Sequence, residues 1–302
     1  MRHIPVLLNE VIETLNPQNG CVYVDGTFGA GGYTRAILEK APTCRVIALD
    51  QDETAIAGGQ DLVKEMNGRL ILKHGNFKDM DTLIDEPVDG IVLDLGVSSM
   101  QIDTPERGFS FQKDGPLDMR MSSVGQTASD IVNTFKEKEL ADIFFEFGEE
   151  KASRRIASKI AEQRKIKPFE TTMELARTIH SVMPFKPGQS DTATRTFQAL
   201  RIYVNNEMGV LDDVLTKAPV LLKKDGRFVV VSFHSLEDRR VKKAFNTLSG
   251  NIPSANRYAP PLPQTDAHFE LLTKKAVQPS ENEIKNNPRS RSSRLRAVRR
   301  IS

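Results

Sequence analysis

Three aspartates and one glycine-rich turn are the residues best suited to chemistry in this chain of 302 residues. Asp25 ends a β-branched run, and Asp50 and Asp94 lie at the ends of two further apolar runs. The turn that follows Asp25 holds four glycines within seven positions, namely Gly26, Gly29, Gly31 and Gly32. Glycine lets a ligand approach the backbone closely, and a carboxylate favours a cationic ligand group. This combination predicts an enzyme with a nucleotide-type cofactor.

The elements that must position these aspartates alternate between strand and helix. Strands are predicted over 22–25, 45–50, 70–74 and 90–95, and helices over 34–40, 53–66 and 79–85. This alternation is typical of a parallel, doubly wound sheet, in which ligands bind outside the carboxyl ends of the strands. A single aspartate in such a place often only caps the next helix. Three on one edge, beside a glycine turn, favour a binding site.

The alternation stops after the fourth strand and resumes later. Residues 101–121 are predicted as loop, 128–183 as helices and 197–217 as one long helix. A strand over 226–232, a helix over 236–248 and strands near 269–273 and 295–301 follow. We therefore predict an α/β fold with a Rossmann-like, doubly wound domain over 1–103 and 199–302. A mostly helical insertion over 104–198 would serve as substrate platform or lid.

The spacing of the glycines helps to distinguish between cofactors. It departs from the Gly-x-Gly-x-x-Gly pattern of dinucleotide sites, and an acid before the turn would repel a pyrophosphate. The ammonium and sulfonium groups of S-adenosylmethionine suit such an acid. Asp50 lies 18 residues beyond Gly32, where an acid accepts hydrogen bonds from ribose hydroxyls. A methyl donor is favoured, and a nicotinamide oxidoreductase on the same fold is the alternative.

Seven strings in order along the chain carry a resemblance to a known family. They are Asp25-Gly-Thr-Phe-Gly-Ala-Gly-Gly32, Leu93-Asp-Leu-Gly-Val-Ser-Ser99, Arg107-Gly-Phe-Ser-Phe111, Gly115-Pro-Leu-Asp-Met-Arg-Met121, Arg195-Thr-Phe-Gln-Ala-Leu-Arg-Ile202, Ser232-Phe-His-Ser-Leu-Glu-Asp-Arg239 and Asn287-Pro-Arg-Ser-Arg-Ser292. From Pro5 to the C-terminal arginines, the chain resembles the small-subunit ribosomal RNA cytosine-N4 methyltransferases, the methyltransferase H or MraW family.

The resemblance implies a class I methyltransferase fold with a helical insertion and S-adenosylmethionine as methyl donor. It implies N4-methylation of one cytidine in the decoding centre of 16S rRNA, and the structured target favours the small ribosomal subunit over free rRNA. Two alternatives stay open. One is a non-catalytic RNA-binding or assembly protein, which we would expect to have lost the three aspartates. The other is a methyltransferase that acts on DNA or protein.

The resemblance also carries over site residues. The cofactor contacts fall on Gly31, Gly32, Tyr33, Asp50, Phe77, Asp94 and Gln101, and the glycine turn adds Asp25. Many family members have histidine where this chain has Tyr33, so we expect that contact to run largely through the backbone. Asp94 is expected to serve the cofactor, the target amine or both. His234, which follows the strand 226–232, is the second catalytic candidate, although Ser235-Leu-Glu-Asp238 also fits a helix cap.

Basic and aromatic residues are the candidates for RNA binding, and they are Arg107, Phe109, Phe111, Arg289, Arg291 and Arg294. Residues 289–302 hold six arginines and no acid, whereas residues 1–288 carry a net charge of −4. Such a cluster favours contact with phosphates, and a disordered tail is the alternative. A basic stripe of Lys151, Arg155 and Lys159 is either part of an RNA platform or a solvated face paired with nearby glutamates.

The composition argues against several other classes. No apolar run approaches the ~18 residues of a membrane span, so we expect a cytoplasmic protein without a membrane partner. Cys21 and Cys44 lie at the starts of strands, away from the aspartates, which argues against cysteine-dependent carbon-5 methylation. The five histidines show no ligand-like spacing, so no metal is expected. The oligomeric state is not readable, and a homodimer stays open.

Overall fold

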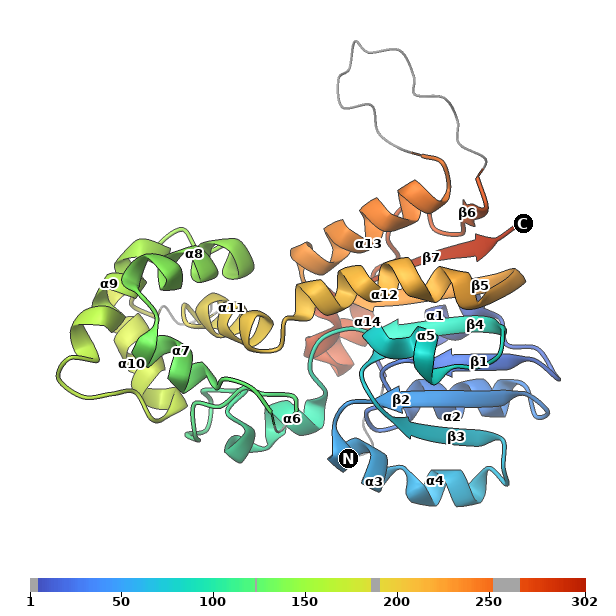
Figure 1. Cartoon of the computed structure of the whole chain (residues 1–302), viewed down its shortest axis with the longest axis horizontal. Helices are drawn as coiled ribbons and strands as arrows, with labels where there is room; N and C mark the ends of the chain where they lie inside the picture. Colours follow the sequence, from blue (N-terminus) through green and yellow to red (C-terminus); the bar gives the residue numbers. More distant parts are fainter. Residues whose placement is uncertain (1–4, 123, 186–190, 252–266) are drawn as a thin grey trace, which may run out of the picture. The chain divides into compact units, whose positions relative to one another are not determined.

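The computed structural model describes residues 5–122, 124–185, 191–251 and 267–302 (Figure 1). The chain divides into two units, Met1–Gly96 with Gly209–Ser302 and Val97–Met208. The predicted insertion over 104–198 lies inside the second of these. Each unit has an apolar core of its own, so we take them in turn.

The first unit is built on a sheet that, within the described ranges, has seven strands in the order β3-β2-β1-β4-β5-β7-β6 (Figure 1). The strands are β1 (Val22–Asp25), β2 (Arg45–Asp50), β3 (Leu70–His74), β4 (Val88–Asp94), β5 (Leu222–Ser232), β6 (Phe269–Leu271) and β7 (Arg294–Arg300). Strands β1 to β5 run parallel, and β7 runs antiparallel to both β5 and β6. Asp25, Asp50 and Asp94 are the last residues of β1, β2 and β4, as predicted.

Helices cover both faces of this sheet. The helical elements of this unit are α1 (Leu8–Leu15), α2 (Gly32–Lys40), α3 (Glu53–Gly58), α4 (Gln60–Glu65), η1 (Phe77–Asp79), α5 (Met80–Leu83), α12 (Glu207–Leu221), α13 (Ser235–Leu248), α14 (Glu281–Asn286) and η3 (Pro288–Ser292). Side chains alternate between the faces of a strand, so Val229 and Val231 pack with α1 and α2, while Phe228 and Val230 pack with α12 and α13. The result is a sheet buried on both sides, as parallel sheets require.

The second unit is helical, as predicted for 128–183. Its elements are α6 (Ser99–Asp103), η2 (Pro105–Arg107), α7 (Ala128–Thr134), α8 (Glu137–Gly148), α9 (Ser153–Gln163), α10 (Thr172–Val182) and α11 (Thr194–Val204). Leu140, Phe144, Ile156, Leu175 and Leu200 meet in its core, one or more from each of the four longer helices. Apolar residues at helical spacing therefore bury one face of each helix.

Two helices that the sequence predicts as continuous are broken. The predicted helix over 197–217 is α11 and α12, because Asn206 adopts a left-handed φ of 47°. Asn205 stabilises the break, since its side chain bonds the Met119 carbonyl at 2.8 Å and the Met121 N–H at 2.7 Å. The predicted helix over 53–66 is α3 and α4, which meet at Gly59.

Several short elements differ from the sequence prediction. Helices α1 and α14 and the turn η3 were not anticipated, and the segment predicted as loop over 101–121 includes the end of α6 and the turn η2. Within the parts of the chain that the structure describes, we find no helix whose length and apolar character would let it cross a membrane.

Gly26 gives a test of how closely the elements around the first turn pack. A Cβ there would lie 2.3 Å from Leu93 Cδ2 and 3.3 Å from Phe77 Cβ, so Gly26→Ala should lower the free energy of unfolding by about 1–3 kcal/mol. Gly58→Ala is the matched control. No atom lies within 4 Å of its added methyl group, and the substitution should stabilise the protein by about 0.5–1 kcal/mol. Urea unfolding measures both, and equal stability of the two variants would contradict the packing described here.

Candidate functional site

The glycine turn between β1 and α2 is bonded to the strands on either side of it. The Gly26 N–H donates to the Val92 carbonyl of β4 at 3.0 Å, and the Phe28 N–H donates to the Leu49 carbonyl of β2 at 2.9 Å. Gly31 is the N-cap of α2 with a left-handed φ of 76°, where glycine is favoured. A Cβ on Gly31 would lie 2.9 Å from the Phe28 ring, so only glycine fits beside it, and the first N–H groups of α2 suit a ligand carboxylate.

Asp25 hydrogen-bonds both to this turn and to the helix that follows it. Its side chain is fully buried, Oδ1 accepts from the Thr27 N–H at 3.1 Å, and Oδ2 accepts from the Thr34 hydroxyl at 2.7 Å. Burial raises the pKa of Asp25 to about 6, and the bonds from Thr34 and Thr27 oppose this rise. Asp25 therefore holds the turn and the start of α2, a role that the sequence reasoning did not assign. Thr27 and Thr34 were missed with it, although Thr27 lies within the recognised string.

Asp50 holds the other end of the turn. Its Oδ2 accepts from the Gly29 N–H and its Oδ1 from the Asp52 N–H, each at 2.8 Å. The residue is only half-buried, so each carboxylate oxygen keeps a lone pair for a ligand hydroxyl. Burial raises the pKa of Asp50 above its ordinary value. The arrangement fits the predicted contact with a ribose.

Asp94 is the least satisfied carboxylate of the three. Its N–H donates to the Thr27 hydroxyl at 2.7 Å, but its buried Oδ1 has no hydrogen-bond partner among the residues that the structure describes. Burial raises the pKa of Asp94 well above its usual range, and the charges of Asp25 and Glu237 raise it further. A buried carboxylate oxygen without a donor is costly, so this position fits a ligand that brings a cation or an N–H group.

The other predicted cofactor residues lie in different places. Phe77 begins η1 beside the turn, with its Cβ 3.3 Å from where a Cβ of Gly26 would lie. The Tyr33 side chain is buried in the core, where its hydroxyl donates to the Val6 carbonyl. Only the backbone of Tyr33 is therefore placed to contact a ligand at the turn. Gln101 is buried in the second unit, where Gln101 and Ser98 form a capping box at the start of α6.

The first unit thus brings together Asp25, Gly31, Gly32, Asp50, Phe77 and Asp94 around one strand-to-helix turn. This set offers helix N–H groups for a carboxylate, acids for cationic groups and an acid for ribose hydroxyls. These are the groups of S-adenosylmethionine, and the residues present therefore fit it.

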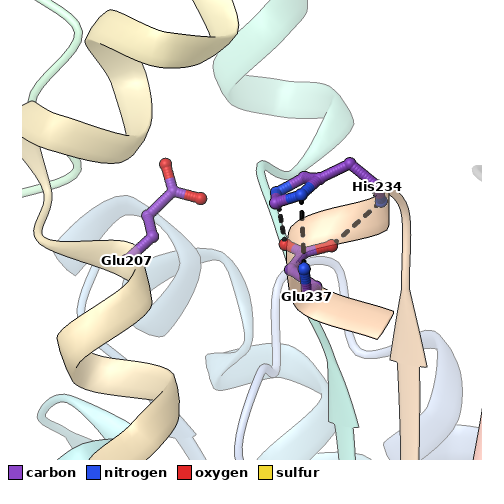
Figure 2. Close-up of side chains that lie close together, drawn as sticks. All are labelled: Glu207, His234 and Glu237. Carbon is purple, nitrogen blue, oxygen red and sulfur yellow. Dashed lines mark hydrogen bonds and ion pairs between the residues drawn. The ribbon is translucent and has the colours of Figure 1, made fainter. Parts of the chain in front are cut away.

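His234 caps α13 together with Glu237 (Figure 2). The Phe233 and His234 N–H groups donate to Glu237 Oε2 at 2.8 and 3.2 Å, and the Glu237 N–H donates to His234 Nδ1 at 3.4 Å. An accepting Nδ1 places the proton of a neutral ring on Nε2, which lies 3.1 Å from Glu237 Oε1 but makes no hydrogen bond among the described residues. The helix-cap alternative therefore accounts for the backbone side of His234, and its catalytic role stays a prediction.

Four of the six C-terminal arginines lie on β7, and all four bind within the first unit. Arg294 and Arg296 both contact Asp238, with Arg296 Nε at 2.7 Å and Arg294 Nη1 at 3.1 Å. Arg299 pairs with Glu270 at 2.7 Å, and Arg300 donates to backbone carbonyls. These arginines fasten the edge of the sheet and are not a disordered tail. Arg289 and Arg291 are exposed on η3, and an RNA contact of Arg289, Arg291 and Arg294 stays a prediction.

The candidates in the second unit also make internal contacts. Arg107 Nη2 donates to the Arg120 and Met121 carbonyls at 3.1 Å, and Arg107 Cζ lies 5.7 Å from the centroid of the Phe109 ring. Phe111 packs edge to face on Phe197, with ring centroids 4.7 Å apart. Both contacts organise the loop before α7, and an RNA contact of Arg107, Phe109 and Phe111 stays a prediction.

The residues of the basic stripe on and before α9 differ in whether their side chains have partners. Arg155 donates to the Val182 carbonyl at 3.1 Å, and Lys159 pairs with Glu162 at 2.8 Å. Lys151 and Arg154 are exposed, and no ion pair or hydrogen bond to their side chains is seen within the described ranges. The solvated, glutamate-paired face therefore describes Lys159, whereas Lys151 and Arg154 remain candidates for an RNA platform.

Comparison with known proteins settles the family. The model of the MraW methylase family matches residues 1–301. The chain belongs to this family. A protein of Granulibacter bethesdensis named ribosomal RNA small subunit methyltransferase H is 52% identical, over 98% of this chain and 90% of the relative. One of the same name from Paramagnetospirillum magneticum is 52% identical, over 99% and 96%.

Solved structures are more distant. An rRNA methylase from Streptococcus thermophilus has a TM-score of 0.39 and 11% identity, over 98% of this chain and 94% of that one. A SAM-dependent O-methyltransferase from Thermotoga maritima has a TM-score of 0.45 and 10% identity, over 100% and 68%. Neither likeness is strong enough to add to the functional argument.

Family membership confirms the main expectations from the sequence. The chain is a methyltransferase with a class I, Rossmann-like α/β fold, and S-adenosylmethionine is its methyl donor. The nicotinamide oxidoreductase alternative was wrong. None of the relatives' names given above mentions a dimer, so they lend the homodimer no support.

The raised pKa of Asp25 makes a prediction about stability. Between pH 4 and 6 the folded protein binds this proton more tightly than the unfolded chain, so the contribution of Asp25 to stability falls as pH rises through that window. Relative to Asp25→Asn, the native protein should lose up to about 3 kcal/mol from pH 4 to pH 7. Unfolding of both proteins in urea across this range measures the difference. A difference that stays constant with pH would show that Asp25 titrates normally.

Proposed function

We propose that this protein transfers a methyl group from S-adenosylmethionine to N4 of a cytidine in the decoding centre of 16S rRNA, on the small ribosomal subunit. Two kinds of support carry the proposal. The relatives, named ribosomal RNA small subunit methyltransferase H, match nearly the whole chain at about half identity. Asp25, Asp50 and Asp94 lie around the glycine turn, and the unpartnered Oδ1 of Asp94 is suited to the positive charge of S-adenosylmethionine and to the target N4 amine.

The residues that would hold the cofactor follow from the geometry of the turn. The N–H groups at the start of α2, after Gly31, suit the carboxylate of the methionine part, and Asp50 suits the ribose hydroxyls. Phe77 lies beside the turn and would pack against the adenine. When bound, S-adenosylmethionine supplies an electrophilic methyl group and a positive charge, and that charge favours the ionised form of Asp94.

The chemistry at the target amine needs positioning and one proton acceptor. The N4 lone pair is delocalised into the cytosine ring, so the amine must be held in line with the methyl group. As the new N–C bond forms, the electron pair of the old methyl bond stays with sulfur and N4 loses one proton. We assign Asp94 to accept a hydrogen bond from N4 and to take that proton. Its raised pKa makes the ionised carboxylate a stronger base than an ordinary aspartate.

RNA contact would come from cations that the fold leaves exposed. Lys151, just before α9, and Arg154, in its first turn, fit this description better than the arginines of β7, which bind acids and carbonyls of their own unit. Arg289 and Arg291 are exposed near the other end of the chain. Lysine and arginine contacts of this kind set the position of an RNA and depend on salt.

Asp94 is tested by a methyl-transfer assay. Small subunits that lack the modification, and free rRNA beside them, receive labelled S-adenosylmethionine, and nuclease digestion identifies the methylated nucleoside. We expect N4-methylcytidine on the subunit, and a kcat at least about 10²-fold lower for Asp94→Asn. Asp213→Asn, an exposed acid of α12, is the control and should match the native protein. Cofactor binding without transfer to either RNA would overturn the proposed substrate.

Lys151 and Arg154 are tested by the salt dependence of binding. The variant Lys151→Gln/Arg154→Gln should bind small subunits about tenfold more weakly at moderate salt, and the slope of log K against log[salt] should fall by about 2. Lys242→Gln/Lys243→Gln removes the same charge from exposed positions of α13 and is the control. If both double variants show the same loss, the effect is one of net charge, and α9 has no special role.

A further inference from the structure

The first described residues of the chain lie directly on the cofactor turn. A Cβ added to Gly32 would lie 2.1 Å from Pro5 Cγ and 3.2 Å from Pro5 Cδ. Gly32 is the first residue of α2, so Pro5 packs where the turn becomes helix. Val6 and Leu7 are buried behind it. The segment Pro5–Leu7 thus forms a strap over the start of α2.

Tyr33 holds this strap from the side of the turn. Its hydroxyl donates to the Val6 carbonyl, and the side chain is almost fully buried. Burial raises the pKa of Tyr33 well above its ordinary value, as do the charges of Asp94 and Asp25, so the hydroxyl stays protonated and keeps its donor role. A phenylalanine would fill the same space but would leave the Val6 carbonyl without this donor.

Glu283 holds the strap from the other end of the chain. Its Oε1 accepts from the Leu7 N–H at 2.7 Å, across 276 positions of sequence. Leu7 has a left-handed φ of 52°, a conformation that is unfavourable for a non-glycine residue and therefore needs support from neighbouring groups. Glu283 is placed by α14, whose N-cap Ser280 accepts from the Glu283 N–H at 3.2 Å.

We propose that Tyr33 and Glu283 are positioning residues that clamp Pro5–Leu7 against Gly32 and so fix the turn for S-adenosylmethionine. The inference rests on the proposed use of this turn for the cofactor. The same two side chains meet consecutive residues of the strap, one on the carbonyl of Val6 and one on the N–H of Leu7. With both bonds in place, the strap has one position, and the N–H groups at the start of α2 are pre-organised.

Equilibrium binding of S-adenosylhomocysteine to the full chain, by titration calorimetry, tests the clamp without any RNA. Tyr33→Phe and Glu283→Ala should each weaken binding about tenfold, the value of one hydrogen bond lost to the turn. Glu283→Gln keeps an acceptor oxygen for the Leu7 N–H and should bind nearly as the native protein does. At saturating cofactor, the kcat for methyl transfer should change less than the KM for S-adenosylmethionine.

The outcomes separate the clamp from a purely structural role. Native protein that binds no S-adenosylhomocysteine would overturn the proposed cofactor turn itself. Native protein that binds, with variants that bind equally well, would overturn only the clamp. A lower midpoint of thermal unfolding with unchanged affinity would also overturn it. If Tyr33→Phe does not fold, the two variants of the half-buried Glu283 test the clamp. Glu283→Ala and Glu283→Gln differ only in the acceptor and the volume of the side chain, so their difference in affinity measures the bond to Leu7.

Discussion

The two bonds that Asp25 makes inside the protein are the constraint on which the site depends. One oxygen takes the Thr27 N–H and the other takes the Thr34 hydroxyl, so a single buried carboxylate joins the turn to the helix after it. The Thr27 hydroxyl then receives the Asp94 N–H. Through this short chain of bonds, the ends of β1 and β4 and the start of α2 keep one arrangement. Loss of Asp25 would loosen all three together.

Charge at this edge of the sheet follows from the same arrangement. Burial of Asp25 and Asp94 raises the pKa of both, the charge of Asp25 raises the pKa of Asp94 further, and the charge of Asp50 raises the pKa of Asp25. Keeping both carboxylates ionised is costly in a protein that binds no cation, and a positive ligand relieves that cost without protonating them. The cost is therefore an argument for function in its own right, independent of any resemblance to a family.

Much of the fold could be predicted from the sequence because local signals were strong. Strands β1, β2 and β3 match their predicted bounds, since β-branched runs ended in polar residues. The break between α11 and α12 could not be predicted. It depends on Asn205 bonding to Met119 and Met121, which lie more than 80 positions away. The three aspartates were found at the strand ends, whereas the roles of Thr34 and Glu283 arise only from tertiary contacts.

The bond between Leu7 and Glu283 spans almost the whole chain, and this has a consequence for how the protein matures. A ribosome delivers the N-terminal part of a protein first, and contacts of large sequence separation form late and slowly. The central strands and the glycine turn are made early, but the partner that fixes the Leu7 backbone is made almost last. A nascent chain can therefore form the glycine turn before Glu283 has been synthesised to fix Leu7. A truncation that removes Glu283 would leave the Leu7 N–H without this acceptor.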